Sequence, residues 1–307
     1  MWKNSFRFLV SISFILIETP FFLTVLFYNA LFLKPSSKLM QRNRALFATL
    51  SVSLWLPFLQ LRVSTQITPK LTSKNNSQPH HKVFLCTHQS FSDALVLALV
   101  FWVYRQSIGP CVALYKRELG KLPILGGLQR YAGNIPVARS GDVEAAKRSL
   151  GEAAVRAREG YHVSGFPEGS RRRTLSTGKR DQIQTLKKGF FHLISELARE
   201  KPVEVYPVVY VGSYRSWPIG SVLPISGSQV TVRVGDPILV ENDQVDMEVL
   251  RSQVSDRLET ELIMSGSPCV SEAFQRGYEM NFFKIFGVEL ILSVVPFLGA
   301  LICYLGS

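Results

Sequence analysis

His88 and Asp93 are the residues whose types and spacing most directly suggest acid–base chemistry. They lie five positions apart in THQSFSD (87–93), at the start of an apolar run. This spacing does not place them on one face of a helix, where neighbours lie three or four positions apart. If His88 lies in a loop and Asp93 in the first turn of the next helix, the carboxylate reaches one ring nitrogen and leaves the other free, as in an oriented general base. The same residues also fit an ordinary helix N-terminus, with Ser90 or Ser92 as the cap and His88 incidental.

A second candidate cluster is FPEGSRRR (166–173), which places Glu168, Gly169 and Arg171 on a tight turn. Gly169 permits close approach of the backbone, and the planar guanidinium of Arg171 suits a phosphate group. Arg139 is a second candidate phosphate ligand. The alternative is a solvated basic loop that holds the protein against anionic lipid, with Arg139 an ordinary surface arginine.

Strands and helices alternate along the chain from residue 82 onward. Short apolar runs separated by stretches of helical length predict an α/β domain over 82–264, with a largely parallel central sheet flanked by helices. Ligands bind beyond the carboxyl ends of such strands, so we expect the loops carrying His88, Arg139 and Glu168 to converge. The predicted strands are 82–87, 111–116, 134–138, 161–166, 203–212 and 229–238, and the predicted helices are 92–104, 141–160, 186–200 and 244–263.

The composition indicates an anionic partner. Lys and Arg outnumber Asp and Glu by 35 to 23, which gives a net charge of +12 over 307 residues, and 47% of the residues are hydrophobic. A basic surface fits acidic lipid headgroups or a phosphorylated substrate; charge alone is non-specific, and we expect no nucleic-acid partner. The four cysteines have no paired spacing, and His80 and His81 lie in a polar stretch without acidic or thiol neighbours. We therefore expect neither a disulfide framework nor a metal site.

Three hydrophobic segments predict a membrane protein. Phe8–Leu33, Ala45–Val63 and Ile285–Leu305 each contain a single charged residue, and a bilayer-spanning helix needs about 20 apolar residues. Prolines interrupt the first two, and the basic loop 34–44 between them fits a shallow hairpin in one leaflet as well as two spanning helices. The expected organisation is an N-terminal membrane hairpin or transmembrane segments (1–67), a linker (68–81), the α/β domain (82–264) and a C-terminal membrane anchor (265–307).

Four blocks in order resemble the membrane glycerolipid acyltransferase family, in particular its lysophosphatidic acid acyltransferase group. The His-x4-Asp spacing of THQSFSD resembles the first block, and KRELGKLPILGGLQRYAGNIPVARS (116–140), which contains Arg139, resembles the second. FPEGSRRR, followed by LKKGFFHL (186–193), resembles the Glu-Gly-Thr-Arg block, and VYPVVY (205–210) resembles the fourth. Thr87 and Ser170 depart from the family's usual asparagine and threonine, which bears on substrate preference more than on activity.

The resemblance implies an acyl-CoA-dependent acyltransferase of phospholipid biosynthesis that needs no cofactor. His88 would be the general base, with Asp93 fixing its tautomer, and would activate the free hydroxyl of a lysophospholipid to attack the thioester. Arg139 and Arg171 would hold the acceptor's phosphate, and Glu168 would position the acceptor or these arginines. Lysophosphatidic acid is the preferred acceptor because it presents a bare phosphomonoester to two arginines.

Other functions remain open at this point. Within the family, the acceptor could be glycerol-3-phosphate or another lysophospholipid. A membrane-bound thioesterase would also use His and Asp, although the chain contains no G-x-S-x-G turn for a nucleophile. A lipid-binding protein that keeps the fold would need no base. We expect the endoplasmic reticulum membrane with the site facing the cytosol if the chain is eukaryotic, or the inner membrane if it is bacterial; the sequence contains no indication of the oligomeric state.

Overall fold

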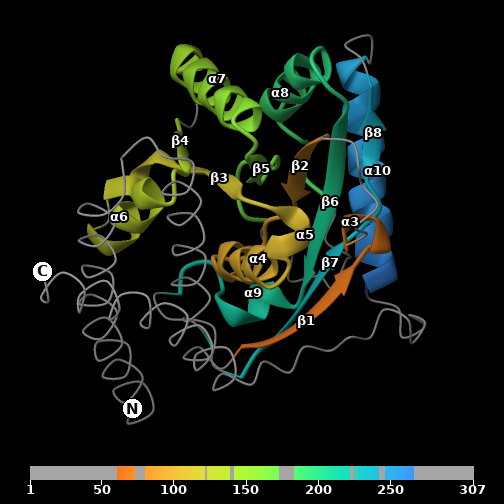
Figure 1. The fold of residues 1–307 in the computed structure, drawn as a ribbon. Coiled ribbons are helices and arrows are strands. Elements are labelled where there is room, and N and C mark those ends of the chain that lie inside the picture. The colour runs from red at the N-terminus through yellow and green to blue at the C-terminus, as the bar shows by residue number, and fades with distance from the viewer. Residues whose placement is uncertain are drawn as a thin grey trace, which may run out of the picture. The chain divides into compact units, whose positions relative to one another are not determined.

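Eight strands form one mixed sheet in the part of the chain that the computed structural model describes (Figure 1). These residues are 61–72, 80–121, 123–138, 142–172, 183–221, 225, 227–241 and 246–265. The strands are β1 (Arg62–Ile67), β2 (His81–Cys86), β3 (Cys111–Lys116), β4 (Ile135–Val137), β5 (His162–Gly165), β6 (Val203–Val211), β7 (Gln229–Val234) and β8 (Ile238–Val240). The helices are α3 (Pro69–Thr72), α4 (Ser92–Val103), α5 (Arg105–Ile108), η1 (Arg117–Lys121), α6 (Pro123–Tyr131), α7 (Val143–Arg158), α8 (Gly189–Ala198), α9 (Ser213–Ser216) and α10 (Met247–Ser265).

The sheet has the strand order β1-β7-β6-β2-β5-β3-β4, and β8 also pairs with β6. β2 lies between β5 and β6 and is parallel to both, and β3 and β4 continue the parallel arrangement. β7 and β8 run antiparallel to β6, with β7 along Val208–Val211 and β8 along Val203–Val205. The predicted α/β domain with a largely parallel sheet is therefore confirmed. The carboxyl ends of β2, β5 and β6 lie at one edge, where α/β sheets bind ligands.

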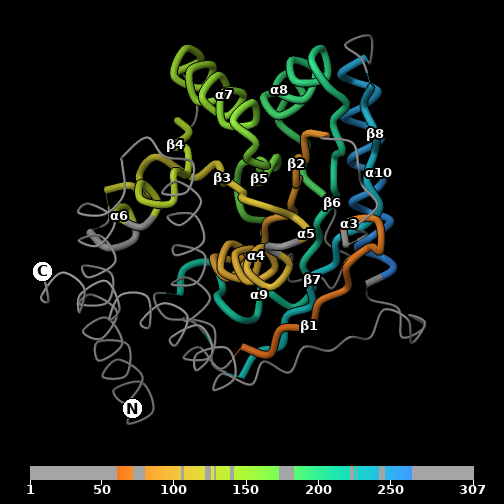
Figure 2. The backbone as a smooth tube through the Cα atoms, viewed as in Figure 1, coloured from red at the N-terminus to blue at the C-terminus, as the bar shows by residue number. Residues whose placement is uncertain are grey.

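β1 extends the sheet beyond the predicted start at residue 82. Arg62–Ile67 pairs in parallel register with Gln229–Val234, and Figure 2 shows the two segments side by side, β1 in orange and β7 in teal. β1 and α3 thus occupy positions where the sequence predicts the end of the membrane region and a linker (68–81). Local periodicity does not reveal β1 because β7, its partner among the described strands, lies far away in the sequence. The remaining domain boundaries stay predictions.

Alternating side chains of β2 point to the two faces of the sheet. Val83 and Leu85 belong to a core that includes side chains of α7, α8 and α10. Phe84 points to the other face, where its ring lies 5.1 Å from that of Phe101 in α4 and 5.2 Å from that of Tyr206 in β6. Successive strand residues point to opposite faces. Because helices cover both faces, the residues of β2 form a continuous apolar run rather than an alternating one.

The expected membrane segments fall almost entirely outside the described residues, which include only the last positions of Ala45–Val63. Within the described ranges, every helix is too short or too polar to cross a bilayer. α4, which carries the apolar run after Asp93, has 12 residues and buries Val96, Leu99 and Val100. These side chains of α4 are therefore part of the core.

Candidate active site

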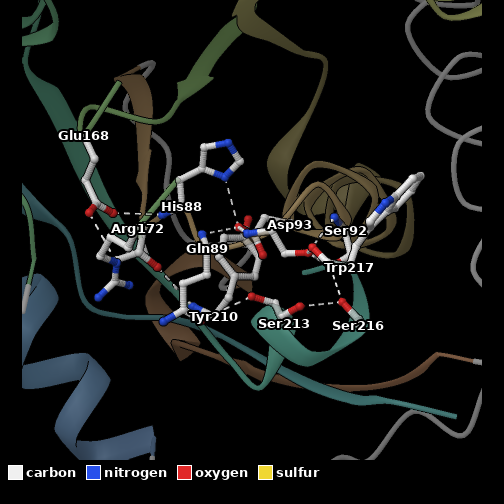
Figure 3. Close-up of polar contacts among 12 residues, drawn as sticks. His88, Gln89, Ser92, Asp93, Glu168, Arg172, Tyr210, Ser213, Ser216 and Trp217 are labelled. Atoms are coloured by element: carbon white, nitrogen blue, oxygen red, sulfur yellow. Dashed lines mark hydrogen bonds and ion pairs between the residues drawn. The ribbon is translucent and has the colours of Figure 1, made fainter. Parts of the chain in front are cut away.

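The His88 ring and the Asp93 carboxylate contact each other at the carboxyl end of β2 (Figure 3). Nδ1 of His88 lies 3.0 Å from Oδ2 of Asp93. His88 lies in the loop after β2, and Asp93 is the second residue of α4, as the sequence predicts. An ionised carboxylate can only accept a hydrogen bond, so Nδ1 donates and the lone pair of the neutral ring lies on Nε2.

The loop before α4 fixes the Asp93 carboxylate. The side chain is fully buried (0% exposed), and Oδ2 accepts the backbone N–H of Gln89 at 2.7 Å and that of Ser90 at 2.8 Å. The N-cap residue of α4 is Phe91, which makes no side-chain cap hydrogen bond, so the prediction of Ser90 or Ser92 as the cap is wrong. Ser90 Oγ does accept the N–H of Ser92 at 3.3 Å. The Asp93 carboxylate turns back from the helix toward His88. The loop therefore orients the histidine rather than capping α4 through a side chain.

The His88 ring is supported on one face and open at one nitrogen. Phe166, the residue directly after β5, stacks on the ring with centroids 4.1 Å apart and planes 24° apart. The side chain of His88 is 13% exposed. No group among the described residues forms a hydrogen bond with Nε2. A substrate hydroxyl can therefore meet the lone pair that a general base uses.

Glu168 holds the backbone of His88 from the neighbouring loop. Its buried carboxylate accepts the N–H of His88 at 2.9 Å and that of Gln184 at 3.2 Å, and it forms an ion pair with Arg172 at 3.3 Å. In Figure 3, Glu168 and Asp93 lie on either side of His88. Burial raises the pKa of the Glu168 carboxyl above its usual value, although Arg172 and the two N–H groups act in the opposite direction. The structure thus joins Glu168 to Arg172 and to the backbone of His88.

The turn around Gly169 also positions Arg171. Gly169 has a φ of +73°, in the left-handed region that favours glycine. The Arg171 guanidinium lies 3.9 Å from the centroid of the Phe91 ring, a cation–π contact with the residue just before α4. Arg171 is therefore brought to the His88 loop, as predicted. Arg139 lies outside the described residues, so its place at the site stays a prediction.

A third loop, SYRSW (213–217) after β6, borders the site and is absent from the sequence-based site. Ser213 Oγ donates to Oε1 of Gln89 at 3.3 Å, and Ser90 Oγ donates to the backbone carbonyl of Trp217 at 3.1 Å. These bonds join α9 to the loop that carries His88, and Figure 3 shows the polar chain between them. The one signal in the sequence that could have identified this loop is its hydroxyl residues, which follow the predicted strand 203–212.

The neighbouring side chains do not supply an activated nucleophile. The hydroxyls of Ser90, Ser92 and Ser216 bond to one another or to backbone, and none of the described serines bonds to His88. Burial raises the pKa of the Cys86 thiol far above its usual range, which keeps it protonated. No set of three or more potential metal ligands occurs in the ranges that the structure describes. The geometry therefore suits direct proton abstraction from an acceptor.

Comparisons with known proteins agree with this geometry. Residues 69–211 match the model of the acyltransferase family. A crystal structure of the 1-acyl-sn-glycerophosphate (LPA) acyltransferase PlsC from Thermotoga maritima is similar, with a TM-score of 0.60 at 20% sequence identity over 85% of this chain and 97% of that chain. At this identity the likeness shows a shared fold. No curated protein matches the chain. The matched segment, 69–211, includes His88, Asp93 and Glu168, and over these residues the chain is similar to the acyltransferase family.

Proposed function

We propose that the protein transfers a fatty acyl group from acyl-CoA to the free hydroxyl of lysophosphatidic acid and forms phosphatidic acid. The observation that carries this proposal is the His88 ring, whose Nδ1 is bonded to the buried Asp93 while Nε2 has no hydrogen-bond partner among the described residues. Acyl transfer to a hydroxyl needs such a base and no covalent acyl-enzyme, since the acceptor itself is the nucleophile. The fold that the chain shares with an LPA acyltransferase supports the choice of reaction.

The reaction requires one base acting twice. Nε2 of His88 removes the hydroxyl proton as the acceptor oxygen attacks the thioester carbonyl carbon. When the carbon–sulfur bond breaks, the imidazolium returns the proton to the departing CoA thiolate, and His88 is neutral again. Asp93 accepts the Nδ1–H throughout and stabilises the imidazolium. Proton transfer supplies ~10²–10⁴-fold, and orientation of two substrates supplies ~7–11 kcal/mol of the barrier.

In this proposal Arg171 and Arg139 hold the phosphate of the acceptor. A guanidinium presents two parallel N–H groups to a phosphate, and the Phe91 ring limits the orientations that Arg171 can adopt. We assign Glu168 to positioning His88, because its carboxylate already accepts two backbone N–H groups and pairs with Arg172. Glycerol-3-phosphate or a lysophospholipid with a larger headgroup is the alternative acceptor.

We place the reaction at a membrane surface. The acceptor and product are lipids, and the hydrophobic segments within 1–67 and 265–307 have the composition of membrane anchors. The proposed location is the endoplasmic reticulum membrane with the site facing the cytosol if the chain is eukaryotic, or the inner membrane if it is bacterial.

The test is release of free CoA from oleoyl-CoA by the purified full chain in detergent, with and without lysophosphatidic acid. We expect release that depends on the acceptor, with phosphatidic acid formed. Equal release without acceptor would indicate a thioesterase instead. If only another lysolipid or glycerol-3-phosphate supports release, the acceptor proposed here is wrong; inactivity with the whole panel would favour a lipid-binding protein.

A further inference from the structure

Apolar side chains beside the site come from the loop that follows α9 and from Phe91, directly before α4. Phe91 is 40% exposed, Ile219 is 45% exposed and Ile225 is 48% exposed. The rings of Phe91 and Trp217 lie edge to face with centroids 5.6 Å apart. We call these four residues (Phe91, Trp217, Ile219 and Ile225) the Trp217 surface. Single exposed apolar residues are common on any protein, but a group adjoining a functional site marks an interaction surface.

Backbone hydrogen bonds fix the shape of this surface. The indole N–H of Trp217 donates to the carbonyl of Ser221 at 3.1 Å, which closes the turn that carries Ile219. The backbone N–H of Ile225 donates to the carbonyl of Ser216 at 2.6 Å. Ile219 is therefore held on a closed turn and the backbone of Ile225 is fixed to that of Ser216, while both isoleucine side chains stay exposed.

The stretch of chain that carries Trp217, Ile219 and Ile225 contains only positive charges. No aspartate or glutamate occurs in the sequence between Glu204 and Asp236, and the exposed Arg215 lies within this stretch. Arg171 lies directly against Phe91, on the side of the phosphate site. Tryptophan, isoleucine and phenylalanine next to arginine form the combination that enters the headgroup region of an anionic bilayer.

We propose that the Trp217 surface inserts into the anionic bilayer that contains the acceptor, as a contact separate from the hydrophobic segments at 1–67 and 265–307. This inference rests on the proposed function, in which both the acceptor and the product are lipids. Insertion at this point brings the headgroup layer to Arg171, so a lysophosphatidic acid can present its phosphate and hydroxyl to the site while its acyl chain stays among lipids. The surface would thus favour acceptors that are embedded in a membrane.

Insertion is measured with a fluorophore on Ile219→Cys or Ile225→Cys in the full chain, after Cys86, Cys111, Cys269 and Cys303 are replaced by alanine. The protein is reconstituted in vesicles of phosphatidylcholine and phosphatidylglycerol that contain a spin-labelled lipid with the quencher near the headgroup. We expect quenching at both positions and none at Val155→Cys, an exposed position on α7. A dye at Ile219→Cys that aqueous iodide quenches but the lipid does not would overturn the proposal. Protection from both quenchers would also overturn it, because the surface would then be covered by another part of the chain or by a second copy.

The functional test compares two physical forms of the acceptor. In the double variant Ile219→Ser and Ile225→Ser, we expect kcat/KM for lysophosphatidic acid embedded in vesicles to fall about tenfold. The value for a short-chain acceptor dissolved as monomers should stay within about twofold of the parent. Val155→Ser is the matched control. An equal loss with both acceptors would contradict the proposal. Quenching requires no turnover, so an inactive protein would refute the proposed function without affecting the test of the surface.

Discussion

Two histidine–carboxylate pairs lie at opposite ends of β2. Nδ1 of His80 is 3.1 Å from Oε1 of Glu204 just before the strand, and Nδ1 of His88 is 3.0 Å from Oδ2 of Asp93 just after it. The histidine side chains are similarly enclosed, at 18% and 13% exposed. Contact with a carboxylate therefore does not by itself distinguish a general base from a structural pair.

The two pairs differ in how the carboxylate is held and in what surrounds it. Oδ2 of Asp93 accepts two loop N–H groups, from Gln89 and Ser90, which aim it at the ring. Glu204 extends from the sheet itself and accepts the hydroxyl of Tyr206 at 2.8 Å. The loops after β5 and β6 converge only at the carboxyl end of β2, where α/β sheets bind ligands. The His88–Asp93 pair therefore differs from the His80–Glu204 pair in its location at the ligand-binding edge and in the preorganisation of its carboxylate.

The largest expected effect separates the two histidines. His88→Ala should lower kcat/KM for acyl transfer by about 10²–10⁴-fold, because the acceptor hydroxyl loses its base. His80→Ala should retain activity within about twofold per folded molecule, since a pair at the amino end of β2 does not face the substrate. Release of CoA from oleoyl-CoA in the presence of lysophosphatidic acid measures both. Equal losses in the two variants would remove the distinction between the pairs.

The next effect separates the two carboxylates. Asp93→Asn keeps the size of the side chain but presents an amide that can donate to Nδ1 and select the wrong tautomer, so we expect kcat to fall about 10²–10³-fold. Glu204→Gln should leave kcat close to that of the parent. The comparison is made on protein whose thermal unfolding shows an intact fold. A small loss in Asp93→Asn would show that the carboxylate does not set the tautomer of His88.

A third effect tests how the backbone of His88 is held. His81, at the other end of β2, donates its N–H to the carbonyl of Pro202 at 3.1 Å within the sheet, whereas His88 donates to the side chain of Glu168. Glu168→Ala should lower kcat about 10–10²-fold through displacement of the His88 loop, and Glu168→Gln, which can still accept the N–H, should restore much of the activity.

The control for this prediction is a second buried glutamate. Glu261 pairs with Arg233 in the part of the fold formed by α10 and β7. Glu261→Gln should lower the melting temperature without changing kcat of the folded protein, because breaking a buried ion pair destabilises the fold. If Glu168→Ala also lowers the melting temperature and leaves kcat unchanged, as Glu261→Gln should, Glu168 is a structural residue with no positioning role.

The elements that the sequence predicts well carry their signals locally. β3 matches the predicted range Cys111–Lys116. The two ends of α7 are set by residues that act through local backbone geometry. Asp142 accepts the N–H of Ala145 at 2.8 Å as the N-cap, and Gly160 after the helix has a φ of +93°. The contact between His88 and Asp93 belongs to the same class, because its geometry depends on one loop and one helical turn.

The missed features depend on pairing across the sheet. β1 is a strand because it pairs with β7. The hydrogen bond between the His88 N–H and Glu168 joins residues 80 positions apart. Phe166 can stack on the histidine only because β2 and β5 are neighbours and end at the same edge. Resemblance identified Glu168 as a site residue, but its role in holding the backbone required the register of two strands. Hydrophobic periodicity contains no information about such register.

A further pair of histidines at the amino ends of β2 and β5 extends the comparison to pH. Burial lowers the pKa of His162 to about 3, assisted by the nearby positive charge of Lys82. Burial likewise lowers the pKa of His81, with Lys201 acting in the same direction. The His162 side chain is therefore neutral in the folded protein at pH values where an exposed histidine is protonated, and the pKa of His81 is shifted in the same direction. Their contribution should appear in stability rather than in catalysis.

Acidification should therefore destabilise the fold through the amino end of the sheet. Below a pH of about 6.5 the unfolded chain binds a proton at position 162 that the folded chain excludes until a pH of about 3, so the free energy of unfolding falls by about 2 kcal/mol from this group between pH 6.5 and pH 5. In His162→Gln this loss disappears, and the drop in melting temperature between pH 7 and pH 5 should be smaller by a few degrees. His192→Gln, which changes an exposed histidine on α8, is the matched control. The same drop in both variants would show that His162 is not the group whose protonation weakens the fold.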